Sequence, residues 1–294
     1  MNDLALKVLA LFFISCIGFA YGLLAKPQTK DIANLLIKVI SPFVVIISIV
    51  QSPGGISYLY FTLGAFLFCS ILCMLAYFIS KFLFKGKERN LFSFTAGTGN
   101  TGYFALPIAL SLFNENQVAI AIFIIIGVNI YEFSVGYYFM NMGGGAKDIL
   151  RKTLKLPVIH AAIIGIIIKL LGVEFNNSFI SVLDNFKGAY SVAGMLIIGM
   201  VLSTGRKSSP DIKFMSVCLF WKHLLVPFIS LAFLFFLPKE QFIVIYLMAL
   251  TPLAGNTVVF SSSLDLHPEK AATSVLLSSL LAIVLIPVCM KFVL

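Results

Sequence analysis

The chain is built from successive apolar runs, and each run has about the length that a helix needs to cross a lipid bilayer. A hydrocarbon core about 30 Å thick is spanned by about 20 apolar helical residues. Ten such segments fit the sequence, at 4–24, 32–50, 57–84, 91–113, 117–141, 157–173, 187–204, 212–237, 241–264 and 270–293. Because backbone groups inside lipid must satisfy their own hydrogen bonds, we expect an all-α membrane protein of ten transmembrane helices. The whole of 1–294 is then a single transmembrane unit.

Composition supports this expectation and excludes most soluble classes. Charged residues make up 11% of the chain, against about 25% in soluble domains. The cysteines lie inside apolar runs without the spacing of a zinc site or a disulfide framework, and are Cys16, Cys69, Cys73, Cys218 and Cys289. No signature of a serine hydrolase, a zinc peptidase or a P-loop enzyme occurs in the sequence. The sequence therefore predicts a protein that is not an enzyme, with no catalytic residue, no metal site and no cofactor.

The basic residues indicate how the helices are oriented. With ten spans, the odd-numbered connections share one side of the membrane and carry most of the 21 lysines and arginines. They are Lys26, Lys30, Lys85, Lys87, Arg89, Lys147, Arg151, Lys152, Lys155, Arg206, Lys207, Lys213 and Lys270. The positive-inside rule assigns this side to the cytoplasm, so we expect a multi-pass protein of the cell (inner) membrane with both termini outside. The net charge of +9 then reflects topology and anionic lipid, and nucleic acid is not an expected partner.

An even division gives two halves of five helices, which must enter the membrane in opposite directions because five is odd. The predicted inverted repeats are 1–145 and 156–294. A short identity supports them, since Gly-Asn-Thr-x-x-Phe occurs around Asn100 in the fourth span and again around Asn256 in the ninth. Each position is in the fourth helix of its half, as an inverted-topology repeat predicts.

Both of these spans contain residues that interrupt helices. Gly99 and Pro107 lie in the fourth span, and Pro252 and Gly255 lie in the ninth. Proline removes a backbone donor and disfavours helix in the residue before it, and glycine lowers the cost of leaving the helix. We expect an unwound segment near the middle of each span. Such a segment is tolerated at that depth only where it lines a polar cavity or is covered by protein.

The unwound segments would form a binding site. The second half of each broken helix would begin near the midplane, so two positive dipole ends would converge there and attract an anionic group. Neutral donors and acceptors at the breaks would complete the predicted substrate site, which consists of Asn100, Thr101, Gly102, Asn256 and Thr257. The alternative is that these small residues only let helices pack closely.

Ionisable residues within the spans are the other functional candidates, because a charge at that depth is costly unless it is paired or solvated. Glu132 and Asn129 are three residues apart in the fifth span and share a helix face, and Lys222 lies deep in the eighth. One of the two charged groups could carry a coupling proton, or Lys222 could balance the charge of an anionic substrate. Equally, Glu132 and Lys222 could form a fixed ion pair between the two spans.

Four stretches of the sequence resemble the auxin efflux carrier family. NTGYFALPIAL (100–110) is similar to the Asn-x-Gly-x-x-Gly-x-Pro signature of that family, with Ala105 in place of the usual glycine. TPLAGNTVVF (251–260) matches the family's spacing from proline to asparagine. The stretch 265–288 resembles the last helix, and 192–203 resembles the seventh, where Gly194 replaces a common proline.

The resemblance implies a fold related to the bile-acid sodium symporters. The first, second, sixth and seventh spans would form a scaffold, and the third to fifth and eighth to tenth would form a mobile transport domain. The two broken helices would cross within that domain, with Asn100 and Asn256 beside the substrate. Movement would be of the elevator type, and the protein could form a homodimer through the scaffold helices.

Together these features predict a secondary active transporter, or permease, for a small organic anion, expected to be a carboxylate. Coupling to a proton or sodium gradient stays open. A sodium-coupled symporter of the bile-acid type is one alternative, but it needs acidic cation ligands, and Glu132 is the only obvious candidate. A membrane receptor or assembly factor that keeps the fold without transporting is the other.

Overall fold

The structure is a computed structural model that describes residues 3–51, 55–141, 155, 157–203 and 211–293. Within these ranges every regular element is a helix and no strand occurs. The chain divides into two compact units, each assembled from segments that are far apart in the sequence. We refer to them as the first unit and the second unit.

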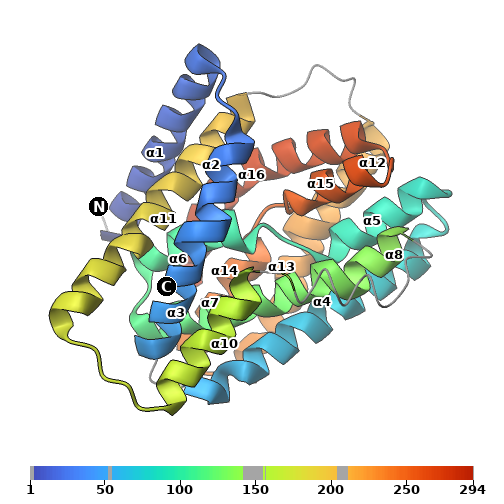
Figure 1. Cartoon of the computed structure of the whole chain (residues 1–294). Coiled ribbons are helices and arrows are strands. Elements are labelled where there is room, and N and C mark those ends of the chain that lie inside the picture. The colour runs from blue at the N-terminus through green and yellow to red at the C-terminus, as the bar shows by residue number, and fades with distance from the viewer. Residues whose placement is uncertain (1–2, 52–54, 142–154, 156, 204–210, 294) are drawn as a thin grey trace. The chain divides into compact units, whose positions relative to one another are not determined.

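The first unit comprises Met1–Tyr60, Gly102–Ile126 and Leu154–Thr204. Its helices are α1 (Asp3–Ala25), α2 (Thr29–Leu35), η1 (Leu36–Ile40), α3 (Ser41–Gln51), η2 (Gly55–Tyr58), most of η3 (Thr101–Ala105), α6 (Leu106–Leu112), the first part of α7 (Glu115–Tyr131), α10 (Pro157–Leu170) and α11 (Asn177–Ser203). Helix α1 packs along α11, as Figure 1 shows, and α3 packs against α10.

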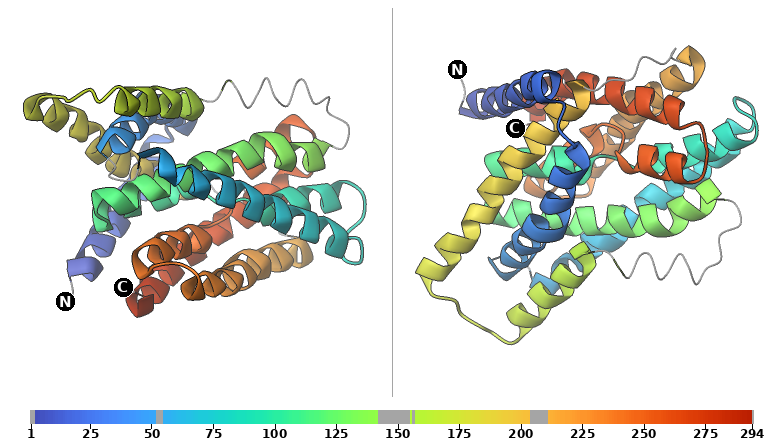
Figure 2. Two further views of the ribbon diagram at one scale, coloured as in Figure 1. Left: turned by 90° about the horizontal axis from the view of Figure 1, so that it is seen from below. Right: turned by 45° about the horizontal axis from the view of Figure 1, so that its top comes forward.

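The second unit comprises Phe61–Thr101, Gly127–Thr153 and Gly205–Leu294. Its helices are most of α4 (Leu59–Ser80), α5 (Lys87–Gly97), the end of α7, η4 (Glu132–Gly136), α8 (Tyr137–Asn141), α12 (Ile212–Phe220), η5 (Trp221–Leu225), α13 (Val226–Ser230), η6 (Leu231–Phe235), α14 (Lys239–Leu250), α15 (Asn256–Ser263) and α16 (Pro268–Val293). Helices α15 and α16 lie side by side (Figure 2).

Glycines set the close packing of α1 on α11 in the first unit. A methyl group added at Gly199 would overlap the carbonyl oxygen of Ser15 and lie 2.6 Å from the backbone nitrogen of Phe19. The Ser15 hydroxyl donates to the carbonyl of Met195 across the same contact, at 3.1 Å. Small residues let helix backbones approach in this way within membranes, where lipid provides no hydrophobic driving force between helices.

Replacing Gly199 with alanine should therefore destabilise the protein by about 1–3 kcal/mol, the usual cost of overpacking. Gly188 in the same helix is the matched control, because a methyl group there meets nothing within 4 Å. Gly188→Ala should raise stability by about 0.5–1 kcal/mol through helix propensity alone. The apparent Tm of the purified variants measures both effects. An apparent Tm for Gly199→Ala at or above that of Gly188→Ala would contradict the close-packing argument.

Aromatic side chains fill the core of the second unit. Phe260 of α15 is central to it, with ring centroids 5.4 Å from Phe94, 5.1 Å from Phe133 and 5.3 Å from Tyr137. Trp221 contacts Phe92 edge-on at 5.6 Å. Such pairs favour edge-to-face geometry because the ring edge is positive and the face negative. The cluster fixes α15 against α5, η4 and α8.

Prolines account for most of the π-helical segments that the structure describes. η1, η3 and η5 are each followed by an α-helix whose second residue is a proline, namely Pro42, Pro107 and Pro227. A proline ring clashes with the carbonyl four residues earlier and cannot donate a hydrogen bond. Widening of the preceding turn relieves both problems and leaves local irregularities within otherwise continuous helices.

A charged cluster stabilises one end of the second unit. The Lys270 ammonium is paired with Glu88 and lies 2.5 Å from Asp211. Asp211 also caps α12, because its carboxylate accepts the Phe214 N–H at 3.0 Å. The hydrogen bond from Lys270 lowers the pKa of Asp211 below its ordinary value, with a further contribution from the Phe214 N–H.

Stability should therefore depend on pH through Asp211. Because its pKa is lower in the folded state, the Asp211 carboxylate stabilises the protein above the unfolded value of about 3.9, and this contribution is lost as the pH falls through the folded value. Asp211→Asn retains the cap, since asparagine caps helices about as well as aspartate, but loses the charge. The difference in apparent Tm between wild type and variant should be present at neutral pH and shrink below about pH 4. A difference that stays constant over this range would contradict the assignment.

The predicted spans coincide with helical segments throughout the described part of the chain, although α11 begins ten residues before the predicted 187–204. Four described helical stretches are long and apolar enough to cross a membrane, and shorter apolar helices accompany them. They are Leu59–Ser80, Glu115–Asn141, Ile212–Phe235 and Pro268–Val293.

Ten membrane crossings, the inverted repeats and the division into scaffold and transport domain stay predictions. The boundary between the repeats and five of the basic residues lie outside the described residues: Lys147, Arg151, Lys152, Arg206 and Lys207.

Candidate functional site

Two helix breaks meet within the second unit. Helix α5 ends at Gly97 and residues 98–100 are not helical, while α14 ends at Leu250 and residues 251–255 separate it from α15. The backbone N–H of Asn100 donates to the carbonyl oxygen of Pro252 at 2.8 Å. Each break therefore satisfies a backbone group of the other, which is how non-helical backbone becomes tolerable away from water. We call this arrangement the crossing.

Glu132 joins the crossing to a third segment. It is the first residue of η4, its side chain is 3% exposed, and one carboxylate oxygen accepts a hydrogen bond from the Thr98 hydroxyl in the first break. The other oxygen accepts from the Asn256 side-chain amide at 2.6 Å, at the start of α15. An ionised carboxylate only accepts hydrogen bonds, so Thr98 and Asn256 are donors of the kind it requires. The two breaks thus share one acidic group.

Lys222 approaches the crossing from η5. Its side chain is 4% exposed, and a methyl group at Gly99 would lie 2.5 Å from its ammonium nitrogen and 2.5 Å from the Thr251 hydroxyl oxygen. Only a residue without a side chain leaves room for both groups beside the first break. The fixed Glu132–Lys222 ion pair, which was one of two alternatives, is not among the contacts within 4.0 Å that join described residues. The two charges still interact at longer range, and the role of Lys222 stays a prediction.

Side chains behind the breaks satisfy the freed backbone groups. At the end of α5, the Trp221 indole N–H donates to the Ala96 carbonyl at 3.1 Å and the Tyr131 hydroxyl donates to the Phe94 carbonyl at 3.0 Å. In the second break, the Leu253 N–H donates to the Ser278 hydroxyl oxygen at 2.8 Å. That hydroxyl lies 2.7 Å from Nε2 of His223. The last carbonyls of a helix need such partners when no water is present. These side chains therefore stabilise the non-helical conformation of the two breaks.

The predicted site residues are distributed over both units. Asn100, Thr101, Asn256 and Thr257 are in the second unit, and the Thr257 hydroxyl is buried without a hydrogen-bond partner among the described residues. Gly102 begins the next segment of the first unit, where its carbonyl accepts from the Tyr190 hydroxyl at 3.0 Å.

The remaining predicted residues occupy three kinds of position. Gly99 and Pro252 lie in the non-helical segments, whereas Pro107 is the second residue of α6 and Gly255 directly precedes α15. Asn129 is half-buried in α7, almost one turn before Glu132. The roles proposed for these residues stay predictions.

Several residues of the crossing were not predicted. Thr98 and Thr251 are hydroxyl residues within the broken segments, so a search of those segments for polar side chains would have found them. Ser278 and Trp221 come from other spans, and no local pattern connects them with the breaks.

As for metals, no group of three or more His, Cys, Asp or Glu side chains is arranged to hold an ion within the described residues.

Comparison with known proteins gives consistent relationships. A family model described as membrane transport protein matches residues 145–290. An uncharacterised transporter of Methanocaldococcus jannaschii is 30% identical over 211 residues, which cover 68% of this chain and 68% of that protein. An uncharacterised transporter of Methanothermobacter thermautotrophicus is 22% identical over 302 residues, covering 97% of this chain and 96% of the relative.

These relationships agree with the apolar helices and with the motifs around the two breaks. They make the chain a multi-pass membrane transport protein and not an enzyme. The stretch matched by the family model includes the second break and Lys222. The relative from M. jannaschii extends the similarity to two thirds of both chains. The chain belongs to the auxin efflux carrier family of membrane transport proteins.

Proposed function

We propose that the protein is a secondary active transporter that carries a small organic anion, a carboxylate, across the cell (inner) membrane. In this proposal ten spans form two inverted repeats with both termini outside. The third to fifth and eighth to tenth spans move as a transport domain along the scaffold by elevator-type alternating access, and the scaffold could also support a homodimer. Membership of a transport family supports the general part of this proposal.

One observation carries the choice of an anion. The crossing brings the 4%-exposed Lys222 ammonium beside Gly99 and Thr251, where no described residue forms an ion pair with it. Helix α15 begins at Asn256, directly after the second break, and the N-terminus of a helix favours negative charge. A buried ammonium without an ion-pair partner within 4.0 Å is costly. A carboxylate that bound here would offset that cost.

Glu132 supports a role in coupling. Its two oxygens accept hydrogen bonds from Thr98 and from Asn256. Protonation would turn one of these oxygens into a donor and force one of the two contacts to change. A cation held at the same carboxylate would compete for the same lone pairs. Occupancy of Glu132 by a proton or by sodium would therefore alter the contacts that both breaks make.

Counterflow in proteoliposomes tests the proposed function. Purified protein is reconstituted into vesicles loaded with one unlabelled carboxylate, and entry of the same labelled carboxylate is followed for a panel of small mono- and dicarboxylates. A transporter exchanges at least one of them faster than protein-free vesicles do, whereas a receptor exchanges none. A prior screen for carboxylates that raise the apparent Tm selects the panel, because a ligand of the folded state increases stability.

Glu132→Gln should remove the dependence of uptake on the coupling gradient while the variant stays folded. Glutamine keeps the size of the side chain but cannot ionise, and its amide nitrogen would face the donor of either Thr98 or Asn256. Uptake of the identified carboxylate is measured under imposed pH and sodium gradients, with Glu174→Gln as a control on an exposed acid of the first unit. If the variant keeps the wild-type response to both gradients, Glu132 is not the coupling residue.

A further inference from the structure

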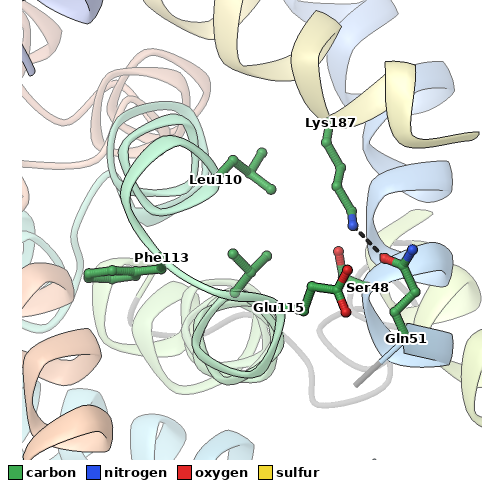
Figure 3. A pocket seen from close by; sticks show the side chains of 7 residues that line it. Ser48, Gln51, Leu110, Phe113, Glu115 and Lys187 are labelled. Atoms are coloured by element: carbon green, nitrogen blue, oxygen red, sulfur yellow. Dashed lines mark hydrogen bonds between the residues drawn. The ribbon is translucent and has the colours of Figure 1, made fainter. Parts of the chain in front are cut away.

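A second polar pocket lies entirely within the first unit, apart from the crossing. It has a volume of about 100 Å³ and lies among α3, α6, α7 and α11. Figure 3 shows Ser48, Gln51, Glu115 and Lys187 near a common space, with Leu110 on the opposite wall and the Phe113 ring directed away from it. Since about 10–15 Å³ of such space admits one water molecule, the pocket can hold a ligand of several non-hydrogen atoms.

The basic residue of the pocket is already neutralised. The Lys187 ammonium lies 2.9 Å from the Asp184 carboxylate, one helical turn away on α11, and donates to the Gln51 carbonyl oxygen at 2.5 Å. The Gln51 amide in turn lies 3.5 Å from both oxygens of Asp184. These three side chains form a closed group in which the positive and negative charges balance. They leave no net positive charge for an anionic ligand.

Two groups in the pocket have no such partner. The Ser48 side chain is 2% exposed, and its hydroxyl is without a hydrogen-bond partner among the described residues. The Glu115 carboxylate lines the same pocket from the first residue of α7, is exposed, and forms none of the ion pairs found between described residues. A buried hydroxyl normally has a partner, and the Glu115 carboxylate gives the pocket a net negative charge. The carboxylate and hydroxyl oxygens can both accept hydrogen bonds from a donor-rich cation.

We propose that this pocket binds a small organic cation with a primary ammonium group. An ammonium carries three donors and no acceptor. One donor would bind the Glu115 carboxylate and another the Ser48 hydroxyl oxygen, while a short alkyl part would contact Leu110 and Val118. The pocket uses no residue of the crossing, so this site is separate from the proposed substrate site and would bind its ligand whether or not the anion proposal holds.

Isothermal titration of the purified full-length protein with three ligands of similar size tests the proposal. Ethylammonium is the cation, ethanol the neutral analogue and propionate the anion. Ethylammonium should bind at least about tenfold more tightly than ethanol, since hydrogen bonds to charged groups contribute about 1.5–3 kcal/mol, and propionate should not compete with it. Equal binding of ethylammonium and ethanol, displacement by propionate, or no binding of ethylammonium would overturn the proposal.

Variants locate the binding. Glu115→Gln should weaken ethylammonium binding by roughly tenfold or more, and Ser48→Ala by about two- to tenfold. Glu174→Gln, at an exposed position between α10 and α11, is the charge-matched control and should bind as wild type does. Lys222→Met should also retain ethylammonium binding, which separates this site from the crossing. Wild-type affinity in Glu115→Gln would overturn the assignment, and the ligand series with the native protein decides the matter if that variant does not fold.

Discussion

Replacing Lys222 with methionine should reduce carboxylate uptake by more than about tenfold, because charge-assisted contacts with a carboxylate contribute about 1.5–3 kcal/mol. Methionine keeps most of the length and apolar volume of the side chain and removes only the ammonium. Its loss also relieves the cost of burying a charge beside Gly99, so the variant is expected to fold. The size-exclusion profile and the apparent Tm should therefore resemble those of wild type while transport is lost.

Lys213→Met is the matched control for this experiment. Lys213 lies in the same continuous helical stretch as Lys222, but at its exposed end, where the ammonium donates to the Leu83 carbonyl at 2.7 Å. Its replacement should leave the initial rate of uptake close to that of wild type. Initial rates in proteoliposomes with equal amounts of reconstituted protein give the comparison. Wild-type uptake by Lys222→Met would mean that the substrate charge is balanced elsewhere.

Asn256→Ala is expected to abolish uptake through a different effect. The Asn256 amide donates to Glu132 at 2.6 Å and thereby links the start of α15 to η4. Removing it leaves a buried carboxylate with one donor fewer, which typically costs about 1–3 kcal/mol or more for a charged acceptor. The crossing should lose its fixed geometry, and a substrate carboxylate would lose a neighbouring amide. Both uptake and the apparent Tm should therefore decrease.

Asn100→Ala distinguishes the role of the Asn100 side chain from that of its backbone N–H. Asn100 occupies the equivalent position in the other break. The Asn100 N–H that binds Pro252 belongs to the main chain and persists in this variant. We expect uptake to be abolished while the backbone link between the two breaks is retained. Asn177→Ala, at an exposed position at the start of α11, is the control. Normal transport by both Asn100→Ala and Asn256→Ala would reject the crossing as the substrate site.

The positions of the helices follow closely from the sequence because lipid imposes one rule on every span. Apolar length predicts each helical segment of the described chain to within a few residues, except at α11. That helix extends back to Asn177 through polar residues such as Asp184 and Lys187, which pair with each other one turn apart. A prediction from hydropathy counts both residues as polar and therefore does not extend the span back past Lys187. The interruptions in the helices were equally predictable from the sequence, since proline and glycine act through local backbone geometry.

The contacts within the site were harder to predict from the sequence, because they depend on how distant segments pack. Glu132 was recognisable as a costly buried charge, but its partners Thr98 and Asn256 lie in different spans and could not be paired by spacing. The alternative of an ion pair with Lys222 rested on charge alone. Charge complementarity is a weak guide inside a protein where neutral donors can satisfy a carboxylate. The pocket around Ser48 had no signal at all in the sequence.

The hydrogen bond between Asn100 N–H and the Pro252 carbonyl involves no side chain. Every amino acid other than proline supplies the same donor, and every residue supplies the same acceptor. This backbone link between the two breaks therefore does not depend on the side chains at positions 100, 101 and 257, whereas Asn256 adds a side-chain link to Glu132. Related chains can change those side chains, and with them the substrate that is bound, without losing the backbone hydrogen bond that joins the two breaks. Selectivity in proteins built this way can diverge one substitution at a time, and engineering a new cargo can begin at positions 100, 101 and 257.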